Sequence, residues 1–208
     1  DSLHNIWIES NNGLVRYDIR ADTFAHFFPA IGSPLDRWVY PFWATSKEVY
    51  CFEHDSVIAS YDIHTFARRR LAGFTPSDSI SGSGGALYSA VVDLKTNSIW
   101  VLRGHGGSYG GPPGGGLIQV SLTTGKKQYF TWSCFKKIPG HNHAAEGMTY
   151  DRKRNCLWIN SWEGLMQFTL DDNQFHYIGA LNPFFADKDY GHWVGISLDQ
   201  KDRVWVAT

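Results

Sequence analysis

The chain has 208 residues, enough for one sizeable core, and its 19 Lys and Arg nearly balance its 20 Asp and Glu. The net charge of −1 provides no basic surface of the kind that binds nucleic acid or anionic membranes. No apolar run reaches the roughly 18–20 residues of a membrane helix, and the first residues lack the features of a signal peptide. With 21 Gly, 9 Trp, 10 Tyr and 13 Phe, the composition favours strands and tight turns over helices, and it predicts an all-β chain.

One sequence motif recurs along the chain. Residues 4–19 read HNIWIESNNGLVRYDI, and residues 155–170 read NCLWINSWEGLMQFTL. Both have a central Trp between apolar residues, then Gly-Leu, then an aromatic residue. Its central motif, an aromatic residue between two apolar residues, occurs five times. The aromatic residues are Trp7, Tyr50, Trp100, Trp158 and Trp205. Their spacings of 43, 50, 58 and 47 residues indicate a repeated structural unit.

Each complete repeat is predicted to hold four strands, which we call A to D in chain order. Strand A is an apolar segment such as SAVVDL, strand B carries the Trp motif, strand C begins with Gly-Leu, and strand D is a short segment such as TFARRRL or QFHYI. Short polar turns such as DRKRN join strand A to strand B. The predicted blade segments are 1–30, 38–74, 86–132, 146–180 and 193–208.

Repeats of four antiparallel strands over 40–50 residues are typical of β-propeller blades. We expect the Trp of strand B to fill the gap between neighbouring sheets. A β-sandwich with coincidental hairpins is the alternative. The chain opens in strand B and stops after another strand B, so we expect a single partial domain over 1–208. It would hold four to five blades of a larger ring, of about seven blades.

The segment DSLHNIWIESNNGLVRYD resembles the two-component regulator propeller repeat. The resemblance is close over residues 1–30 and 146–208, looser over 38–74, where Tyr50 replaces the Trp, and interrupted between 86 and 132. It implies the periplasmic or extracellular sensor region of hybrid histidine kinases of Bacteroidetes, which respond to breakdown products of complex glycans. It also implies that kinase activity, the remaining blades and the membrane anchor lie in other segments, and that this segment is not an enzyme.

Antiparallel topology divides the connections between two ends of each sheet. A–B and C–D turns, at one end, are short and polar. B–C and D–A connections, at the other end, are long and contain most of the His and aromatic residues. Long connections on a rigid scaffold are where binding sites usually lie, so we expect the site at that end.

Three groups of candidate ligand-binding residues lie in these connections. The first is RGHGGSYGGPPGGG, with His105 and Tyr109, which is either a flap over a ligand or a tolerated surface insertion. It lacks the lysine of a phosphate-binding loop. The second is HNHAAE, in which His141, His143 and Glu146 form a weak metal motif, and loop polarity is the simpler interpretation.

The third group pairs polar residues with tryptophans where the chain enters strand A. Arg37 and Trp38 lie in LDRWVY, and His192 and Trp193 lie in DYGHWVG. Aromatic rings stack on sugars while planar polar groups bind hydroxyls, so these residues suit a saccharide. Packing between blades is the competing role. Trp162, in a B–C turn, is a further candidate.

The sequence therefore favours a glycan-sensing binding domain without a cofactor or catalytic residue of its own. Its expected partners are an oligosaccharide, the other blades and downstream signalling domains, with a homodimer as a further option. A propeller hydrolase or lyase is the enzyme alternative, and Asp36, Asp78, His141 and Glu146 would be its candidates. A protein-interaction ring is the third alternative.

The three cysteines have no CxxC spacing, which argues against a zinc knuckle. A single disulfide between Cys134 and Cys156 is the alternative. Free thiols, including Cys51, are the preferred interpretation.

Overall fold

The computed structural model describes residues 5–10, 13–27, 39–53, 56–75, 87–103, 116–131, 145–161, 164–179 and 195–207. Within these ranges the regular structure is entirely strand, and consecutive strands pair antiparallel. This confirms the predicted all-β class. The chain divides into two compact units, Asp1–Phe74 and Thr75–Thr208, which are described separately. The prediction of a single domain within a larger ring stays a prediction.

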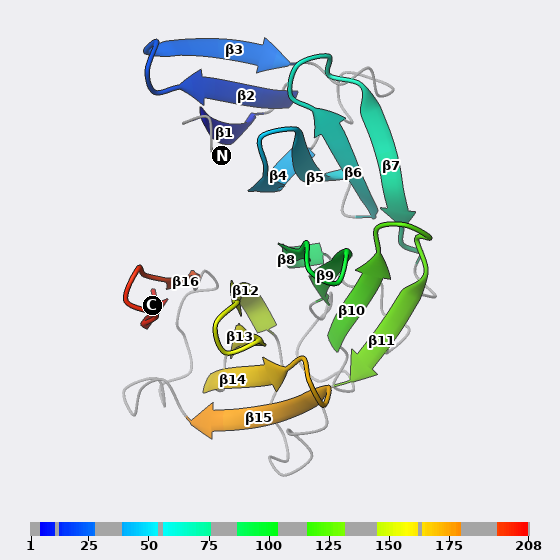
Figure 1. Ribbon diagram of the computed structural model, residues 1–208, viewed down its shortest axis with the longest axis vertical. Coiled ribbons are helices and arrows are strands. Elements are labelled where there is room, and N and C mark those ends of the chain that lie inside the picture. The colour runs from blue at the N-terminus through cyan, green and yellow to red at the C-terminus, as the bar shows by residue number, and fades with distance from the viewer. Residues whose placement is uncertain are drawn as a thin grey trace, which may run out of the picture. The chain divides into compact units, whose positions relative to one another are not determined.

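The first unit contains two sheets (Figure 1). One has three strands, equivalent to strands B, C and D of a repeat, and the other has all four in the order A to D. Their bounds are β1 (Asn5–Ser10), β2 (Gly13–Asp18) and β3 (Thr23–Phe27), then β4 (Val39–Ala44), β5 (Glu48–Glu53), β6 (Val57–Asp62) and β7 (Arg68–Gly73).

The second unit contains two complete four-stranded sheets and one strand pair. Counted along the whole chain, the third sheet is β8 (Leu87–Asp93), β9 (Ser98–Arg103), β10 (Gly116–Ser121) and β11 (Lys127–Thr131). The fourth sheet is β12 (Ala145–Asp151), β13 (Cys156–Ser161), β14 (Gly164–Thr169) and β15 (Gln174–Gly179). The strand pair is β16 (Ile196–Leu198) with β17 (Val204–Val206). Strand β12 contacts β8 and β16, so the A strands of successive sheets are neighbours (Figure 1). These sheets have the strand order predicted for propeller blades.

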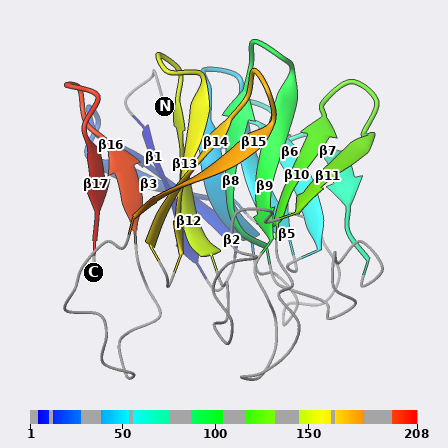
Figure 2. The same ribbon diagram turned by 90° about the horizontal axis from the view of Figure 1, so that it is seen from below.

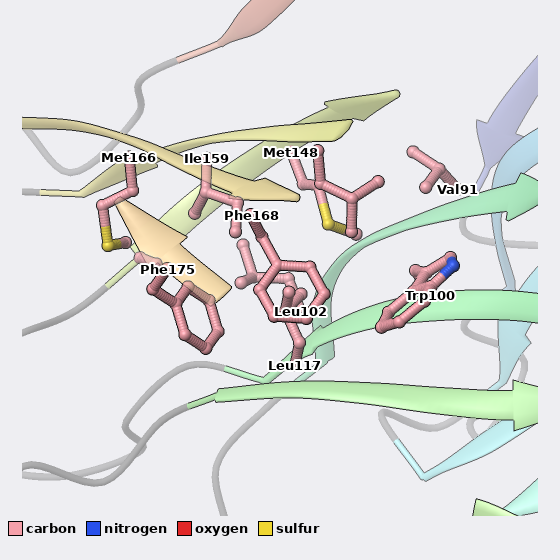
Figure 3. Packing of buried hydrophobic residues seen from close by; sticks show 11 residues of the cluster. Val91, Trp100, Leu102, Leu117, Met148, Ile159, Met166, Phe168 and Phe175 are labelled. Carbon is pink, nitrogen blue, oxygen red and sulfur yellow. The ribbon is translucent and has the colours of Figure 1, made fainter. Parts of the chain in front are cut away.

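The second unit is held together by an aromatic core between its two four-stranded sheets (Figure 3). Trp100 of strand B is only 2% exposed, and its ring centroid lies 5.4 Å from that of Phe168 in the next sheet. Phe130 of strand D lies 5.2 Å from Phe168, and Phe175 lies 4.5 Å from it. The strand B tryptophan therefore fills the space between sheets, as the repeat predicts.

The first unit repeats this arrangement with different partners. Trp7 and Phe27 pack against a buried cluster that includes Val49 and Cys51 of the next sheet. Phe27 also stacks on Phe66, with ring centroids 3.7 Å apart and an interplanar angle of 14°. In both units a Trp of strand B and a Phe of strand D join one sheet to the next.

Phe66 also changes where a predicted strand begins. The segment TFARRRL was expected to start the fourth strand of the second repeat, but Phe66 has a φ of 59° and belongs to the C–D turn, so β7 begins at Arg68. Other turns place Asp22, Asn97 and Asn155 in this left-handed region, which suits Asn and Asp better than Phe. Stacking on Phe27 accompanies the strained backbone of Phe66.

The recurring Gly before Leu has a steric cause. Gly164, the first residue of β14, has a φ of +147°, and a Cβ there would lie 2.2 Å from the carbonyl oxygen of Gly179. Gly13 occupies the same place in β2 with a φ of 116°. Only glycine adopts such a conformation readily, so the Gly-Leu pair marks the start of strand C.

We expect Gly164→Ala to lower the free energy of unfolding by about 2 kcal/mol, because it adds both backbone strain and a clash. Gly195→Ala is the matched control, since among the described residues its Cβ would meet Ala207 at an ordinary 3.8 Å. Urea denaturation of both variants checks this prediction. Equal stability of the two variants would contradict it.

Cys51 and Cys156 are buried free thiols. The preferred interpretation is confirmed for these two, while Cys134 lies outside the described residues. Burial is the main cause that raises the pKa of both thiols.

Candidate functional site

In each four-stranded sheet, the strand ends that carry the long connections lie in one row. In the third sheet Arg103 pairs with both Leu87 and Gly116, and Gly116 pairs with Thr131. The same row is formed by Val39, Glu53, Val57 and Gly73 in the second sheet. In the fourth it is formed by Ala145, Ser161 and Gly164, and Gly179 pairs with the next residue, Leu165. We call this row the loop end and the opposite end, with the short turns, the turn end. The D–A connections and the B–C connection 104–115 therefore attach at the loop end, as predicted, whereas the B–C connections 11–12, 54–56 and 162–163 are short, contrary to the prediction.

The predicted ligand-binding residues belong to connections that leave or enter the sheets at the loop end. All of them lie outside the described residues, so their roles stay predictions: Arg37, Trp38, His105, Tyr109, His141, His143, Trp162, His192 and Trp193. Glu146, the carboxylate of the weak metal motif, lies in β12, but its side chain is not described. Asp36 and Asp78, considered for the enzyme alternative, also lie outside the described residues.

The turn end is fixed by aspartates that end strand A. Asp151 Oδ1 accepts the backbone N–H groups of Lys153 and Arg154, at 3.1 and 3.0 Å, and its Oδ2 accepts the indole N–H of Trp158 at 3.2 Å. Asp199 repeats this arrangement and accepts the indole N–H of Trp205 at 2.9 Å. The side chain of Asp thus holds both the A–B turn and the Trp ring of strand B.

The other two complete sheets vary this arrangement. In the third, Asp93 Oδ2 accepts the hydroxyl of Thr96 at 2.5 Å instead of an indole N–H. In the second, Thr45 Oγ1 takes the place of the Asp carboxylate and accepts the N–H of Glu48 at 3.0 Å. Tyr50, which replaces the Trp, donates to the Glu48 carboxylate at 2.9 Å. In residues 38–74, which match the repeat less closely, Thr45 and Tyr50 therefore replace the Asp and Trp of the other repeats and still hold the A–B turn.

Asparagines of the A–B turns also bind the C–D turns. Asn97 Nδ2 donates to Thr123 Oγ1 at 2.6 Å, and Asn155 Nδ2 donates to Asp171 Oδ1 at 2.5 Å. Between sheets of the second unit, Lys153 Nζ lies 2.7 Å from Asp202 Oδ2. In this unit the short turns lie together at one side (Figure 2). The turn end is a cross-linked scaffold, which favours the loop end as the place for binding.

Among the described residues, the buried carboxylate at the loop end is that of Glu53, which is 1% exposed. Arg68 of strand D binds it through two nitrogens, with Nε to Oε1 at 2.8 Å and Nη2 to Oε2 at 2.5 Å. The hydroxyl of Tyr61, from strand C, donates to the same Oε1. Strands B, C and D are thereby joined by one charged cluster, on the face that packs against the first sheet.

This cluster supports the loop end and is unsuited to acid–base chemistry. Burial, together with the hydrogen bond to Glu53, raises the pKa of Tyr61, so the phenol stays protonated. The hydrogen bond to Glu53 raises the pKa of Arg68, so the guanidinium stays charged. Because Arg68 and Tyr61 both bind it, the Glu53 carboxylate acts as a structural anchor at the base of the 54–56 connection.

Sequence reasoning did not identify Glu53, Tyr61 and Arg68. A signal was present, because Glu53 follows the apolar run Val49–Phe52 of β5 and strand D of the same sheet begins with three consecutive arginines. A charge in a strand that is buried on both faces requires a partner.

Comparison with solved structures gives the same fold. The extracellular domain of BT4673 from B. thetaiotaomicron matches in two structures, in which it is called a one-component system and a hybrid two-component system. The matches cover 99% and 98% of this chain at 17% identity, with TM-scores of 0.64 and 0.61. The chain has the fold of these extracellular domains. It spans 25% and 23% of their length.

A second relative in fold is PorZ, a surface component of the type-IX secretion system of Porphyromonas gingivalis. It matches 98% of this chain and 30% of its own length, at 15% identity and a TM-score of 0.62. No family model matches the chain, and no curated protein matches it. The fold implied by the sequence resemblance is thus confirmed, and the likeness of the described sheets carries no information about a ligand.

The turn-end aspartates predict how stability depends on acid. Hydrogen bonds from Thr65 and His64 hold the pKa of Asp62 below its usual value, and those from Ala21 and Arg20 do the same for Asp18. Their stabilising contribution is present above the ordinary Asp pKa and is lost as the pH falls through the lowered value.

We therefore expect the free energy of unfolding to fall as the pH drops below about 4. Asp62→Asn keeps the turn acceptor but removes the titration, so its acid dependence should be less steep than that of the wild type. Urea denaturation at several pH values measures both slopes. Identical slopes would contradict the assignment for Asp62.

Proposed function

We propose that the chain is a ligand-sensing, extracytoplasmic β-propeller segment of a two-component signalling receptor. The observation that carries this proposal is the contrast between the two ends of each sheet. The turn end is cross-linked by Asp, Asn and Trp contacts, while the long connections attach at the opposite end. A fold shared with the extracellular domains of BT4673 supports a sensing role in place of a catalytic one.

The extracytoplasmic location rests on the same likeness, because the BT4673 matches are extracellular domains. The described part of the chain contains no helix that could cross a membrane. The membrane anchor and a histidine kinase would belong to other segments of the receptor, as would further blades.

We propose that the ligand is a fragment of a complex glycan. Arg37, Trp38, Trp162, His192 and Trp193 all belong to connections at the loop end, and they combine aromatic rings with planar polar groups. Such residues bind the apolar face and the hydroxyls of a sugar. A ligand that binds one receptor conformation more tightly than another shifts the signalling equilibrium toward it.

The described residues include no group of three His, Cys, Asp or Glu side chains that could hold a metal ion. Among the same residues, the carboxylate buried at the loop end, Glu53, is already bound by Arg68 and Tyr61. Glu53 is therefore a structural carboxylate, and the proposed recognition role rests on the loop-end connections.

Isothermal titration calorimetry with acidic and neutral oligosaccharides tests the proposal, on this chain and on the complete extracellular region. We expect one saccharide class to bind, and Trp193→Ala to weaken binding about tenfold or more. Lys153→Ala, at the turn end, is the control that should leave binding unchanged. Failure of every oligosaccharide to bind either protein would overturn the sensing role.

The enzyme alternative has its own readout in the same experiment. Chromatography of the oligosaccharides after incubation would detect cleavage. Turnover that is lost in Glu146→Gln or His143→Ala would favour a hydrolase or lyase over a sensor.

A further inference from the structure

Each of the four A–B turns that the structure describes carries a lysine at the same position. In every one of them the backbone N–H of this lysine donates to the side chain at the end of strand A, at 2.8–3.1 Å. The lysines are Lys47, Lys95, Lys153 and Lys201, and their acceptors are Thr45, Asp93, Asp151 and Asp199. Hydrogen bonds within one repeat therefore set the position of each lysine.

In the second unit three of these turns lie together at the turn end (Figure 2). The A strands that lead into them are neighbours, because β12 contacts both β8 and β16. An ion pair joins two of the turns, with Lys153 Nζ 2.7 Å from Asp202 Oδ2. Lys95, Lys153 and Lys201 therefore lie on one surface of this unit.

The acidic side chains at this surface are engaged within the protein. Asp93 and Asp151 are only 2% and 1% exposed. Each of the aspartates that the structure describes at the turn end of this unit accepts a hydrogen bond: Asp93, Asp151, Asp171, Asp172, Asp199 and Asp202. Their negative charges thus serve to hold the turns.

The lysines at the same end are exposed to solvent instead. Lys95, Lys126 and Lys201 are exposed, and none of the three forms an ion pair with another residue that the structure describes. Lys126 belongs to the C–D turn of the third sheet, which Asn97 joins to the A–B turn. The side chain of Lys153 is 74% exposed even within its ion pair. These four lysines form the lysine surface, which is cationic although the charges of the whole sequence nearly cancel.

One apolar side chain lies among these lysines. Leu94, directly before Lys95 in the A–B turn of the third sheet, is 55% exposed. The same position holds Arg152 in the fourth sheet and Gln200 in the strand pair. The lysine surface therefore combines separated positive charges with an exposed leucine.

We propose that the lysine surface binds an anionic lipid surface. Lysines bind headgroup phosphates as point charges, and an apolar side chain beside them can enter the boundary between headgroups and acyl chains. The lysines are spread over turns of two sheets and the strand pair, which suits a flat partner better than a peptide segment. In the receptor proposed above, and only this consequence rests on that proposal, the contact would turn the loop end away from the membrane.

Co-sedimentation with lipid vesicles tests the lysine surface. The probe is a vesicle of phosphatidylcholine and phosphatidylglycerol in equal parts, and a vesicle of phosphatidylcholine alone is the comparison. We expect the chain to bind only the anionic vesicle, and the binding to weaken as salt is added, because salt screens exposed charges. A wild type that does not bind the anionic vesicle, or that binds both vesicles equally, would overturn the proposal.

Variants assign the binding to named side chains. One lysine near an anionic surface contributes a factor of about five to the partition coefficient, so Lys95→Gln, Lys126→Gln and Lys201→Gln together should lower it about a hundredfold. Leu94→Ala should lower it about fivefold, because it removes apolar atoms from the lipid boundary. A triple variant that binds the anionic vesicle as tightly as the wild type would overturn the assignment.

A matched control separates position from total charge. Arg70→Gln also removes one positive charge, but Arg70 lies against Gly73 at the loop end of β7, so vesicle binding should stay unchanged. Lys95→Gln alone should lower it about fivefold. Urea denaturation should give the same stability for both variants, because the backbone of Lys95, and not its side chain, holds the turn.

Two further measurements distinguish this proposal from others. The triple lysine variant should bind saccharides as the wild type does, so a failure of vesicle binding and a failure of the sensing role are read separately. Soluble polyglutamate is the probe for an acidic protein partner. Lysine-dependent binding of polyglutamate without binding to the anionic vesicle would overturn the lipid assignment.

Discussion

Phe168→Ala is expected to lower the free energy of unfolding by about 4 kcal/mol, which is typical of a large aromatic removed from a core. Phe168 is 0% exposed, and its ring contacts those of Trp100, Phe130 and Phe175 at centroid distances of 4.5–5.4 Å. The rings of Trp100, Phe168 and Phe175 come from both sheets of the second unit (Figure 3). The cavity would therefore lie at the joint between the sheets, and urea denaturation of the variant measures its cost.

A matched control for this substitution is available beside Phe130. Tyr129→Ala, on β11, removes an aromatic ring that is 41% exposed, so it should cost about 1 kcal/mol or less. Phe168→Leu should fall between the two, because it leaves a smaller cavity. Equal losses for Phe168→Ala and Tyr129→Ala would mean that the aromatic core does not join the sheets.

Arg68→Ala should lower the free energy of unfolding by about 3 kcal/mol, because it leaves the buried Glu53 carboxylate without its counter-charge. The side chain of Glu53 is 1% exposed, and that of Arg68 is 37% exposed. The remaining hydrogen bond from Tyr61 compensates only in part. Arg70→Ala, two residues along β7, is the control and should change stability by about 0.5 kcal/mol or less.

A double variant separates the charge effect from lost packing. Glu53→Gln combined with Arg68→Met removes both charges, so it should be clearly more stable than Arg68→Ala alone. Chemical denaturation of the three variants gives the comparison. If the double variant were no more stable than Arg68→Ala, the unpaired charge would not be the cause of the loss.

The sequence was sufficient to predict the repeating sheets, because its signals are local. Apolar alternation, the Trp of strand B and the Gly-Leu pair each follow from contacts within one repeat or with the next. Trp100 and Gly164 show this directly, one through burial between sheets and the other through its backbone conformation. Phe66 was misassigned because stacking on Phe27 overrides the usual preference of that turn position.

The sequence indicates that Glu53 needs a partner, but it does not identify Tyr61 and Arg68, because that choice depends on the register of three strands. Glu53 and Arg68 are fifteen positions apart, and only the pairing of three strands brings them together. The candidate ligand-binding residues pose a different difficulty. Long connections have no repeating pattern, so sequence reasoning can place their attachment points at one end of the sheets but not their contacts.

The pairing of strand B with strand C has a consequence for how chains with this fold diversify. Arg103 pairs with Gly116 across the connection 104–115, and Ser161 pairs with Gly164 across the much shorter connection 162–163. The first and last residues of these two connections are thus paired in the same way, although the connections differ greatly in length. Selection can lengthen, shorten or exchange these inserts without disturbing the barrier to unfolding set by the sheets, so new specificities can evolve on an unchanged framework.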